Sequence, residues 1–275
     1  MYFSIAKIWQ GRQKNFMITG MSSSCFYPLE TEKSLIKCGE MGFKNVEIFT
    51  NTYTELIEPM KSEFKSIIDH YGLNVISVHP FTSFAESTVI FGTYPRRVDD
   101  GMEFYKNYFE FAASLGAKFL ILHGAKIGPY ADNEEYFERY ARLYRIGQEY
   151  GITVSQENVV HFRSQCPDFI KRMSDYLGDE FSMTLDLKQC RRAGESPFKF
   201  IELIGNKINH VHLSDYSDNS DCLPPFEGIE KFDIIIEKIK ANNYKGNYII
   251  ELYSKNFKNP AQIINAAMKF DKLLS

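Results

Sequence analysis

The sequence has no surplus of basic residues, no long apolar run and no closely spaced pair of cysteines. Lysine and arginine number 32 and aspartate and glutamate 35, which gives a formal net charge of −3. Because proteins that bind nucleic acid usually carry a basic surplus, we expect no nucleic-acid partner. No stretch reaches the roughly 18 consecutive apolar residues of a membrane-spanning helix, so we expect no membrane partner either.

The five cysteines are widely spaced, odd in number and without a Cys-x-x-Cys motif. This pattern argues against a disulfide framework and favours a reducing, cytoplasmic location. Lys7 interrupts the apolar stretch near the beginning, so we expect no signal peptide. No Pro/Gly/Ser-rich linker divides the chain. We interpret residues 1–15 as an N-terminal extension and residues 16–275 as one catalytic domain.

Amphipathic helices and short apolar strands alternate along the chain. Apolar residues at helical spacing, such as Phe64, Ile67 and Ile68, predict helices, and a glycine such as Gly72 follows each one. After a short link comes a β-branched run that ends in a polar or ionisable residue. The predicted strands cover residues 16–22, 45–50, 74–80, 118–125, 152–159, 181–188, 208–215 and 247–254.

Eight strand–helix units in about 250 residues are typical of a TIM barrel. Strands this apolar favour a parallel sheet that is buried on both faces. The alternative is a doubly wound open sheet, but that fold usually has fewer strands, and no Gly-x-Gly-x-x-Gly motif follows the first strand here. We therefore predict an α/β protein with a single-domain (β/α)8 TIM barrel.

Ionisable residues stand at or near the ends of six successive predicted strands. In a parallel barrel these C-terminal strand ends form the face where chemistry occurs. Since side chains alternate along a strand, we expect the six to converge on the barrel axis. One such residue would mean little, because a lone histidine there is more often structural and a lone acid is commonly a helix N-cap. The six are His79, His123, Glu157, Asp186, His212 and Glu251.

The joint pattern indicates a metal site. Six acids and imidazoles, with no arginine or lysine expected at the same depth, would repel one another or lie desolvated at a cost on the order of several kcal/mol. A bound cation removes that cost. The last four strands supply hard oxygen donors and one imidazole, which favours Mn²⁺, Mg²⁺ or Co²⁺ and tolerates Zn²⁺. These candidate ligands are Glu157, Asp186, His212 and Glu251.

His79 and His123 lie on the two preceding strands and leave two interpretations open. In the first, they complete a second, zinc-like site in which Glu157 is a bridging ligand. In the second, they donate hydrogen bonds to the hydroxyl groups of a substrate.

Four strand motifs carry a family resemblance: QEN (156–158), LDL (185–187), HVHLSD (210–215) and IIELY (249–253). They resemble the xylose-isomerase-like TIM-barrel superfamily of AP endonuclease family 2 type. Within it they look most like sugar phosphate isomerases and epimerases that include the D-tagatose 3-epimerase-type ketose epimerases. The resemblance covers about residues 16–275. It is specific because acid, acid, histidine and acid fall on strands five to eight in the family order.

The resemblance implies one divalent metal, with Mn²⁺ as the expected ion, held by the four candidate ligands. It implies that Glu157 and Glu251 also move protons as an acid/base pair. The implied function is isomerisation or epimerisation of a sugar or sugar phosphate through a metal-stabilised enediolate. Many members of the family are dimers or tetramers, which implies a homodimer or homotetramer.

Two departures from the family pattern concern the substrate more than the metal ligands. Many members carry a histidine three residues after the strand-six aspartate, whereas this chain has Gln189, whose amide does not titrate near neutral pH. Relatives often read His-Leu-Pro-Pro-Gly further on, whereas this chain has Cys222 and Phe226 at the first and last of these positions.

Three other functions stay open on the sequence. A keto-inositol dehydratase would use the same enolate chemistry and expel a β-hydroxyl group. An apurinic-site endonuclease-like phosphodiesterase would need further metal ligands where Gln189 and Cys222 stand, and the net negative charge argues against it. A sugar-binding barrel without catalysis would have the same ligands, because ligands alone do not prove turnover.

Further candidates for substrate binding lie on the loops of the predicted active face. Basic side chains there would receive a substrate phosphate, although solvated loop charge is the more common role of such residues. The segment from Phe81 to Asp100 is the longest predicted loop, and we interpret it as a lid. The substrate-binding candidates are Gln189, Arg191, Arg192, Lys126 and His161.

Overall fold

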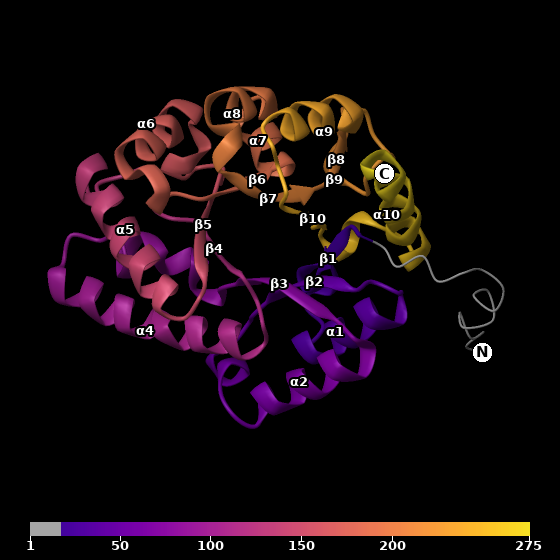
Figure 1. The fold of residues 1–275 in the computed structure, drawn as a ribbon, viewed down its shortest axis with the longest axis horizontal. Coiled ribbons are helices and arrows are strands. Elements are labelled where there is room, and N and C mark those ends of the chain that lie inside the picture. Colours follow the sequence, from indigo (N-terminus) through magenta and orange to yellow (C-terminus); the bar gives the residue numbers. More distant parts are fainter. Residues whose placement is uncertain (1–17) are drawn as a thin grey trace.

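Eight parallel strands close into a barrel in the computed structural model, which describes residues 18–275. The barrel strands follow one another around the ring in chain order, and the last pairs with the first (Figure 1). The predicted TIM barrel is confirmed. Its strands are β1 (Gly20–Ser22), β2 (Asn45–Phe49), β3 (Asn74–His79), β4 (Phe119–Leu122), β5 (Thr153–Glu157), β6 (Met183–Asp186), β7 (Ile208–Leu213) and β10 (Asn247–Ile250).

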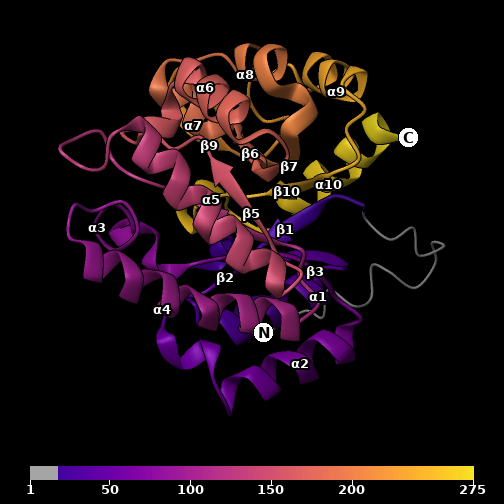
Figure 2. The same ribbon diagram turned by 60° about the vertical axis from the view of Figure 1, so that its left-hand side comes forward.

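Helices cover the outside of the barrel, as the two views show (Figures 1 and 2). Their apolar stripes face inward, and Phe64 and Ile67 of α2 are buried as predicted. Gly72 ends that helix with a φ of 58°, a conformation that glycine adopts without a Cβ penalty. No helix within residues 18–275 is long and apolar enough to cross a bilayer. The helices are α1 (Thr31–Glu40), α2 (Met60–Tyr71), α3 (Glu86–Val89), α4 (Pro95–Ser114), α5 (Asn133–Glu149), α6 (Pro167–Leu177), α7 (Leu187–Ala193), α8 (Pro197–Ile204), α9 (Phe232–Ala241) and α10 (Pro260–Leu274).

The N-terminal extension predicted for residues 1–15 lies outside the described residues, as do the first two residues of the strand predicted over 16–22. The chain that leads into β1 is joined to the C-terminal helix. Asp271 of α10 accepts hydrogen bonds from the backbone N–H groups of Ile18 at 3.0 Å and Thr19 at 2.8 Å. These bonds hold the two ends of the described chain together where the barrel closes.

Two segments depart from the simple repeat. An antiparallel hairpin of β8 (Asp215–Ser217) and β9 (Ser220–Leu223) follows β7. The segment from Phe81 to Asp100, predicted as a long loop, is instead mostly helical, because it contains a 3₁₀ turn, α3 and the start of α4. Its middle is buried against the barrel, so the prediction of a long loop was wrong. The 3₁₀ turns are Ser23–Phe26, Tyr53–Leu56, Phe81–Ala85, Arg163–Gln165, Gly178–Glu180, Gly205–Lys207 and Ser254–Asn256.

The strand register brings the ionisable residues to a common level. Asp186 of β6 pairs with His212 of β7, and His212 in turn pairs with Ile249 of β10. The side chains two positions before the six predicted residues fill the barrel interior beneath them, as expected from the alternation along each strand. These fully buried residues are Ser77, Ile121, Ser155, Thr184, His210 and Ile249.

Glu86 is a fully buried carboxyl group in the segment that follows β3. It accepts a 2.8 Å hydrogen bond from the hydroxyl of Tyr105 and a 2.6 Å hydrogen bond from the backbone N–H of Gly124. Burial raises the pKa of Glu86 to about 8, against the opposing effect of these hydrogen bonds. The carboxyl group is therefore largely protonated in the folded protein at neutral pH, whereas in the unfolded chain it ionises near pH 4.5.

A raised carboxyl pKa makes the folded state less stable as the pH rises from the unfolded pKa to the folded one. We expect the free energy of unfolding to fall by about 3 kcal/mol between pH 5 and pH 8 because of Glu86. Glu86→Gln should remove this slope, since an amide keeps an acceptor for Gly124 and does not titrate. Urea unfolding of both proteins across this pH range measures the slope of the free energy of unfolding, and Glu63→Gln at an exposed position is the control. An unchanged slope in Glu86→Gln would contradict the assignment.

Candidate metal centre

The barrel brings together all six ionisable residues that the strand ends predict. His79 and Glu157 are the last residues of β3 and β5, and His123 and Glu251 directly follow β4 and β10. Asp186 ends β6, and His212 lies near the end of β7. Five of the six are buried, and His123 is partly exposed. The predicted convergence at the C-terminal end of the barrel is therefore observed.

Three carboxylates surround one imidazole nitrogen. His212 Nδ1 lies 3.1 Å from Glu157 Oε1, 3.7 Å from Asp186 Oδ2 and 3.6 Å from Glu251 Oε2. Donor atoms that bind one ion at about 2.1 Å lie about 3.0–3.5 Å apart, so these separations are close to those of a ligand set. Asp186 Oδ2 is buried and has no hydrogen-bond partner in the described chain. The donor set and this unsatisfied oxygen both fit a divalent cation.

Asp186 serves two purposes with its two oxygens. Oδ1 accepts a 2.9 Å hydrogen bond from the backbone N–H of Gln189 and so caps the first turn of α7. Oδ2 is left to face His212. The helix-cap interpretation and the ligand interpretation of this residue are therefore compatible.

The two oxygens of Glu157 face different imidazoles. Oε1 faces His212, whereas Oε2 lies 3.0 Å from His123 Nε2 and 3.7 Å from His79 Nε2. The two histidine nitrogens are 3.0 Å apart. Three donors at such separations could hold a second ion with Glu157 between the two sites. The alternative in which these histidines bind substrate has the same geometry, because both rings line the cavity above the centre.

Lys188 contradicts the expectation that no cation lies at this depth. Its side chain is 5% exposed, and its Nζ lies 2.7 Å from Glu251 Oε2 and 3.4 Å from Asp186 Oδ2. The reason is the immediate start of α7 after β6, which turns the second helical residue back over the barrel mouth. Burial lowers the pKa of Lys188, but the charges of Asp186 and Glu251 outweigh it and raise that pKa well above its ordinary value.

The carboxylates respond to these neighbours in different directions. Burial alone would raise the pKa of Glu157, but the imidazoles of His123 and His212 outweigh it and hold that pKa well below its usual range. Lys188 and His212 likewise lower the pKa of Glu251 against the effect of burial. Burial dominates at Asp186 and raises its pKa. Two of the three carboxylates are thus favoured in the ionised form.

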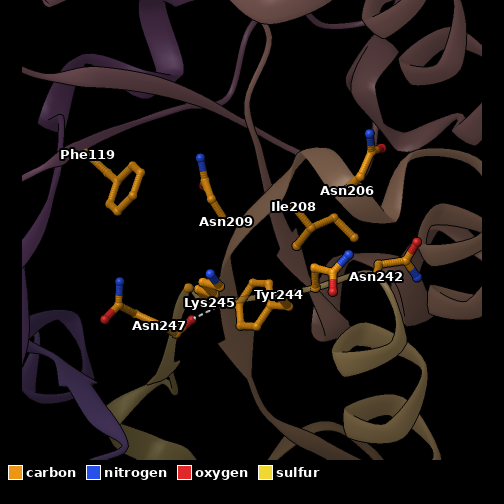
Figure 3. A pocket seen from close by; sticks show the side chains of 10 residues that line it. Phe119, Asn206, Ile208, Asn209, Asn242, Tyr244, Lys245 and Asn247 are labelled. Atoms are coloured by element: carbon orange, nitrogen blue, oxygen red, sulfur yellow. Dashed lines mark hydrogen bonds between the residues drawn. The ribbon is translucent and has the colours of Figure 1, made fainter.

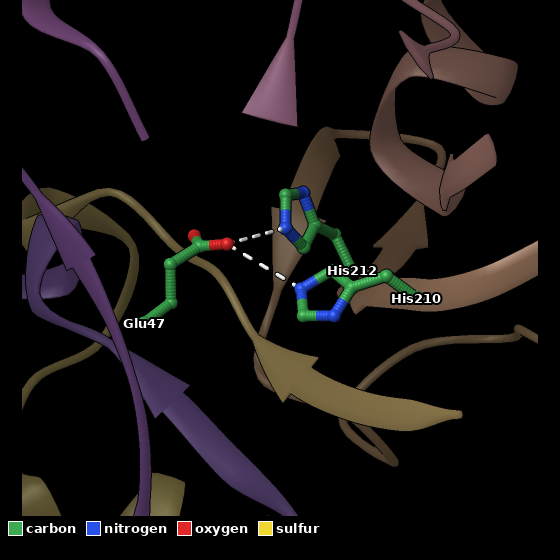
Figure 4. Close-up of side chains that lie close together, drawn as sticks. All are labelled: Glu47, His210 and His212. Atoms are coloured by element: carbon green, nitrogen blue, oxygen red, sulfur yellow. Dashed lines mark hydrogen bonds and ion pairs between the residues drawn. The ribbon is translucent and has the colours of Figure 1, made fainter. Parts of the chain in front are cut away.

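Glu47 is a buried acid at this centre that sequence reasoning missed (Figure 4). Its Oε2 accepts a 2.7 Å hydrogen bond from the hydroxyl of Ser77 and lies 3.1 Å from His212 Nε2 and 3.4 Å from His210 Nε2. The register pairs Glu47 on β2 with Ser77 on β3. An acidic residue inside an otherwise apolar strand was the available signal. Glu47 thus contacts Nε2 of His212, whereas Nδ1 of the same imidazole faces the other three carboxylates.

A cavity of about 430 Å³ opens above the centre, a volume suited to a small ligand. Glu157, Glu251, His79 and His123 reach it, and Gln189 also lines it. Lys188 is the only lysine or arginine among the described residues that line it. Its other walls are mostly aromatic: Tyr27, Phe49, Phe81, Phe84 and Tyr253.

The remaining substrate-binding candidates do not line this cavity in the described structure. Lys126 and His161 are exposed on the loops after β4 and β5. Arg191 is exposed and lies over the ring of Tyr216, 4.3 Å from its centroid. Arg192 pairs with Asp221 and donates a 2.7 Å hydrogen bond to the hydroxyl of Tyr253, so it supports the cavity wall from outside. Their predicted contact with a substrate stays a prediction.

A second cavity, of about 290 Å³, lies at the other end of the barrel, where the strands begin (Figure 3). Half of the residues that line it are asparagines, and Tyr244 and Lys245 also line it. Asn209 there hydrogen-bonds Ser155 and Ser182, and the hydroxyl of Tyr244 donates to the carbonyl of Asn247. No acid or histidine lines this cavity within the described residues, so the candidate chemistry is confined to the opposite end.

The family model described as "Xylose isomerase-like TIM barrel" matches residues 35–273. The chain belongs to this family. An uncharacterized protein of Methanocaldococcus jannaschii is 24% identical over 254 residues, which cover 87% of this chain and 84% of that protein.

Solved structures confirm the shared fold. A D-tagatose 3-epimerase-like protein is 21% identical, with a TM-score of 0.75 and coverage of 94% of this chain and 97% of the other. The 3-keto-D-glucoside 4-epimerase of E. coli is 18% identical, with a TM-score of 0.73 and coverage of 93% and 99%. The IOLI protein with a bound zinc atom is 15% identical, with a TM-score of 0.75 and coverage of 94% and 97%.

Proposed function

We propose that this protein is a divalent-metal-dependent sugar isomerase or epimerase in which Glu157 and Glu251 form the acid/base pair. The observation that carries the proposal is the convergence of three carboxylate oxygens on His212 Nδ1 beneath a cavity of small-molecule size. The family, and the epimerase names of two structural neighbours, support a sugar as the substrate.

Glu157 and Glu251 are placed to act on opposite sides of one substrate. They come from β5 and from the end of β10, which stand three places apart in the ring, and both reach the cavity. One carboxylate removes the proton from the carbon beside a carbonyl group. For epimerisation the other returns a proton to the opposite face, and for isomerisation a proton returns to the neighbouring carbon.

The other residues of the centre hold and shape it. Asp186 and His212 lie below the cavity floor and, with the two glutamates, would bind one divalent ion. When bound, such an ion supplies Lewis acidity toward a substrate carbonyl. The aromatic walls, such as Phe49 and Tyr253, cover the apolar C–H surface of a sugar and exclude water. Mn²⁺ is the ion we propose, and the zinc in the IOLI protein supports a divalent ion at this fold.

The test is substrate proton exchange in D₂O. Protein stripped with a chelator and reloaded with Mn²⁺ is incubated with ketoses, keto-inositols and their phosphates, and deuterium at the carbon beside the carbonyl is followed by NMR. We expect metal-dependent exchange with at least one ketose, together with its isomer or epimer as product. Loss of water from a keto-inositol would instead identify a dehydratase. Metal-loaded protein that exchanges no proton with any member of the panel would refute the proposal.

A further inference from the structure

We propose that Lys188 is a built-in cation of the metal centre, which shares two ligand oxygens with the divalent ion and thereby weakens its binding. The inference rests on the proposed function for the presence of the ion, and adds a residue that sets how tightly the ion is held. It starts from one contact: the Lys188 ammonium touches the acidic cluster itself rather than its rim.

The oxygens that Lys188 contacts are the ones that face the imidazole ligand. Glu251 Oε2 lies 2.7 Å from Lys188 Nζ and 3.6 Å from His212 Nδ1. Asp186 Oδ2 lies 3.4 Å from Lys188 Nζ and 3.7 Å from the same nitrogen. The ammonium and an ion at the centre therefore compete for the same two oxygens.

The charges point the same way. The buried ammonium cancels one of the negative charges that the carboxylates of the centre carry when they are ionised. Without Lys188 a divalent ion meets one more unit of uncompensated negative charge. Coulomb attraction inside a protein acts at a much lower effective dielectric than in water, so this difference is large.

The ammonium also has an aromatic partner at its present position. The ring of Tyr253 lies 5.1 Å from Lys188 Nζ, within the range of a cation–π contact. Lys188 and Tyr253 both line the cavity. An arriving ion can therefore displace the ammonium from part of its contact with the two oxygens, and the ammonium keeps the ring of Tyr253 as a favourable partner.

Metal binding by charge variants tests the proposal without substrate. We expect chelator-stripped Lys188→Gln to bind Mn²⁺ about tenfold more tightly or better than wild type in calorimetric titration. Lys188→Arg keeps the charge and should stay near the wild-type affinity. Lys65→Gln removes the same charge from an exposed position on α2 and should change nothing. Without metal, Lys188→Gln should melt at a lower temperature than wild type, and Mn²⁺ should raise its melting temperature by more.

Lys188→Met is a second neutral variant in case the amide binds to the carboxylates. If either neutral variant folds only when Mn²⁺ is present, the ion has replaced the lysine charge, and the proposal is supported. Equal or weaker Mn²⁺ binding by both variants overturns it, as does failure to fold with Mn²⁺. Absence of binding to every protein overturns it together with the metal centre. Tight binding without proton exchange leaves it standing and overturns the proposed function alone.

Discussion

Glu157→Gln is expected to lower substrate proton exchange by about 10³-fold while the protein still binds its metal ion. The amide has nearly the shape of the carboxylate, and its carbonyl oxygen can still face His212 Nδ1, which lies 3.1 Å from Oε1 in the native side chain. An amide cannot accept the proton that the reaction removes. The loss should therefore appear in kcat at saturating metal and not only in metal affinity.

The measurement is the rate of deuterium incorporation at several Mn²⁺ concentrations, so that affinity and rate are separated. Glu251→Gln should show a loss of similar size, because both carboxylates reach the cavity. Glu134→Gln in the first turn of α5, on the outside of the barrel, is the matched control. A Glu157→Gln protein that regains the full rate at high Mn²⁺ would show that Glu157 binds metal without moving protons.

The barrel and the six strand-end residues could be predicted because both follow from local patterns. The period of each apolar run identifies a strand or a helix, and parallel strands place all their C-terminal ends on one face. His79, Glu157 and Asp186 lie near the ends of the predicted strands and are the last residues of β3, β5 and β6 in the structure. The set of four candidate ligands likewise needed only the order of the strands.

Residues whose position depends on contacts between distant strands were not predictable in the same way. Glu47 lies in the middle of β2, and only the closed ring brings its carboxylate to His210 and His212 on β7. His210 is fully buried in the barrel interior, but its partner Glu47 is not visible in the local sequence. A buried acid is identified by the residues that satisfy it, and here these are Ser77, 30 positions away, and the two histidines, 163 and 165 positions away.

The sequence did not show which side chains on the segments after the strands reach the cavity, and the reason is geometric. Lys188 and Arg191 are both basic residues of the segment that follows β6, three positions apart. Because α7 starts directly after Asp186, Lys188 stands in its first turn beside the centre, whereas Arg191 lies about one turn further along and packs over Tyr216. Which of these residues reaches the cavity is set by its distance along the helix from the strand end, and a prediction of loop placement does not contain that distance.

Glu47→Ala is expected to destabilise the protein by about 3–5 kcal/mol, the cost of breaking a buried ionic contact by removing one partner. The carboxylate is fully buried, and its loss leaves the hydroxyl of Ser77 and two imidazoles without their acceptor. Metal affinity should fall as well, by about 10–100-fold. We expect this because a proton on His212 Nε2 that is shared with Glu47 would leave the lone pair on Nδ1 free for a metal ion.

Urea unfolding of metal-free protein measures the first effect, and titration of the folded variant with Mn²⁺ measures the second. Glu47→Gln keeps an acceptor oxygen and should retain more of both than Glu47→Ala. Glu55→Ala provides a control, since Glu55 is a buried acid that accepts hydrogen bonds from Thr31 and Asn51 and touches no imidazole among the described residues. It should lower stability and leave Mn²⁺ affinity unchanged. If Glu47→Ala is unstable yet binds Mn²⁺ as wild type does, Glu47 only fills the barrel and does not orient His212.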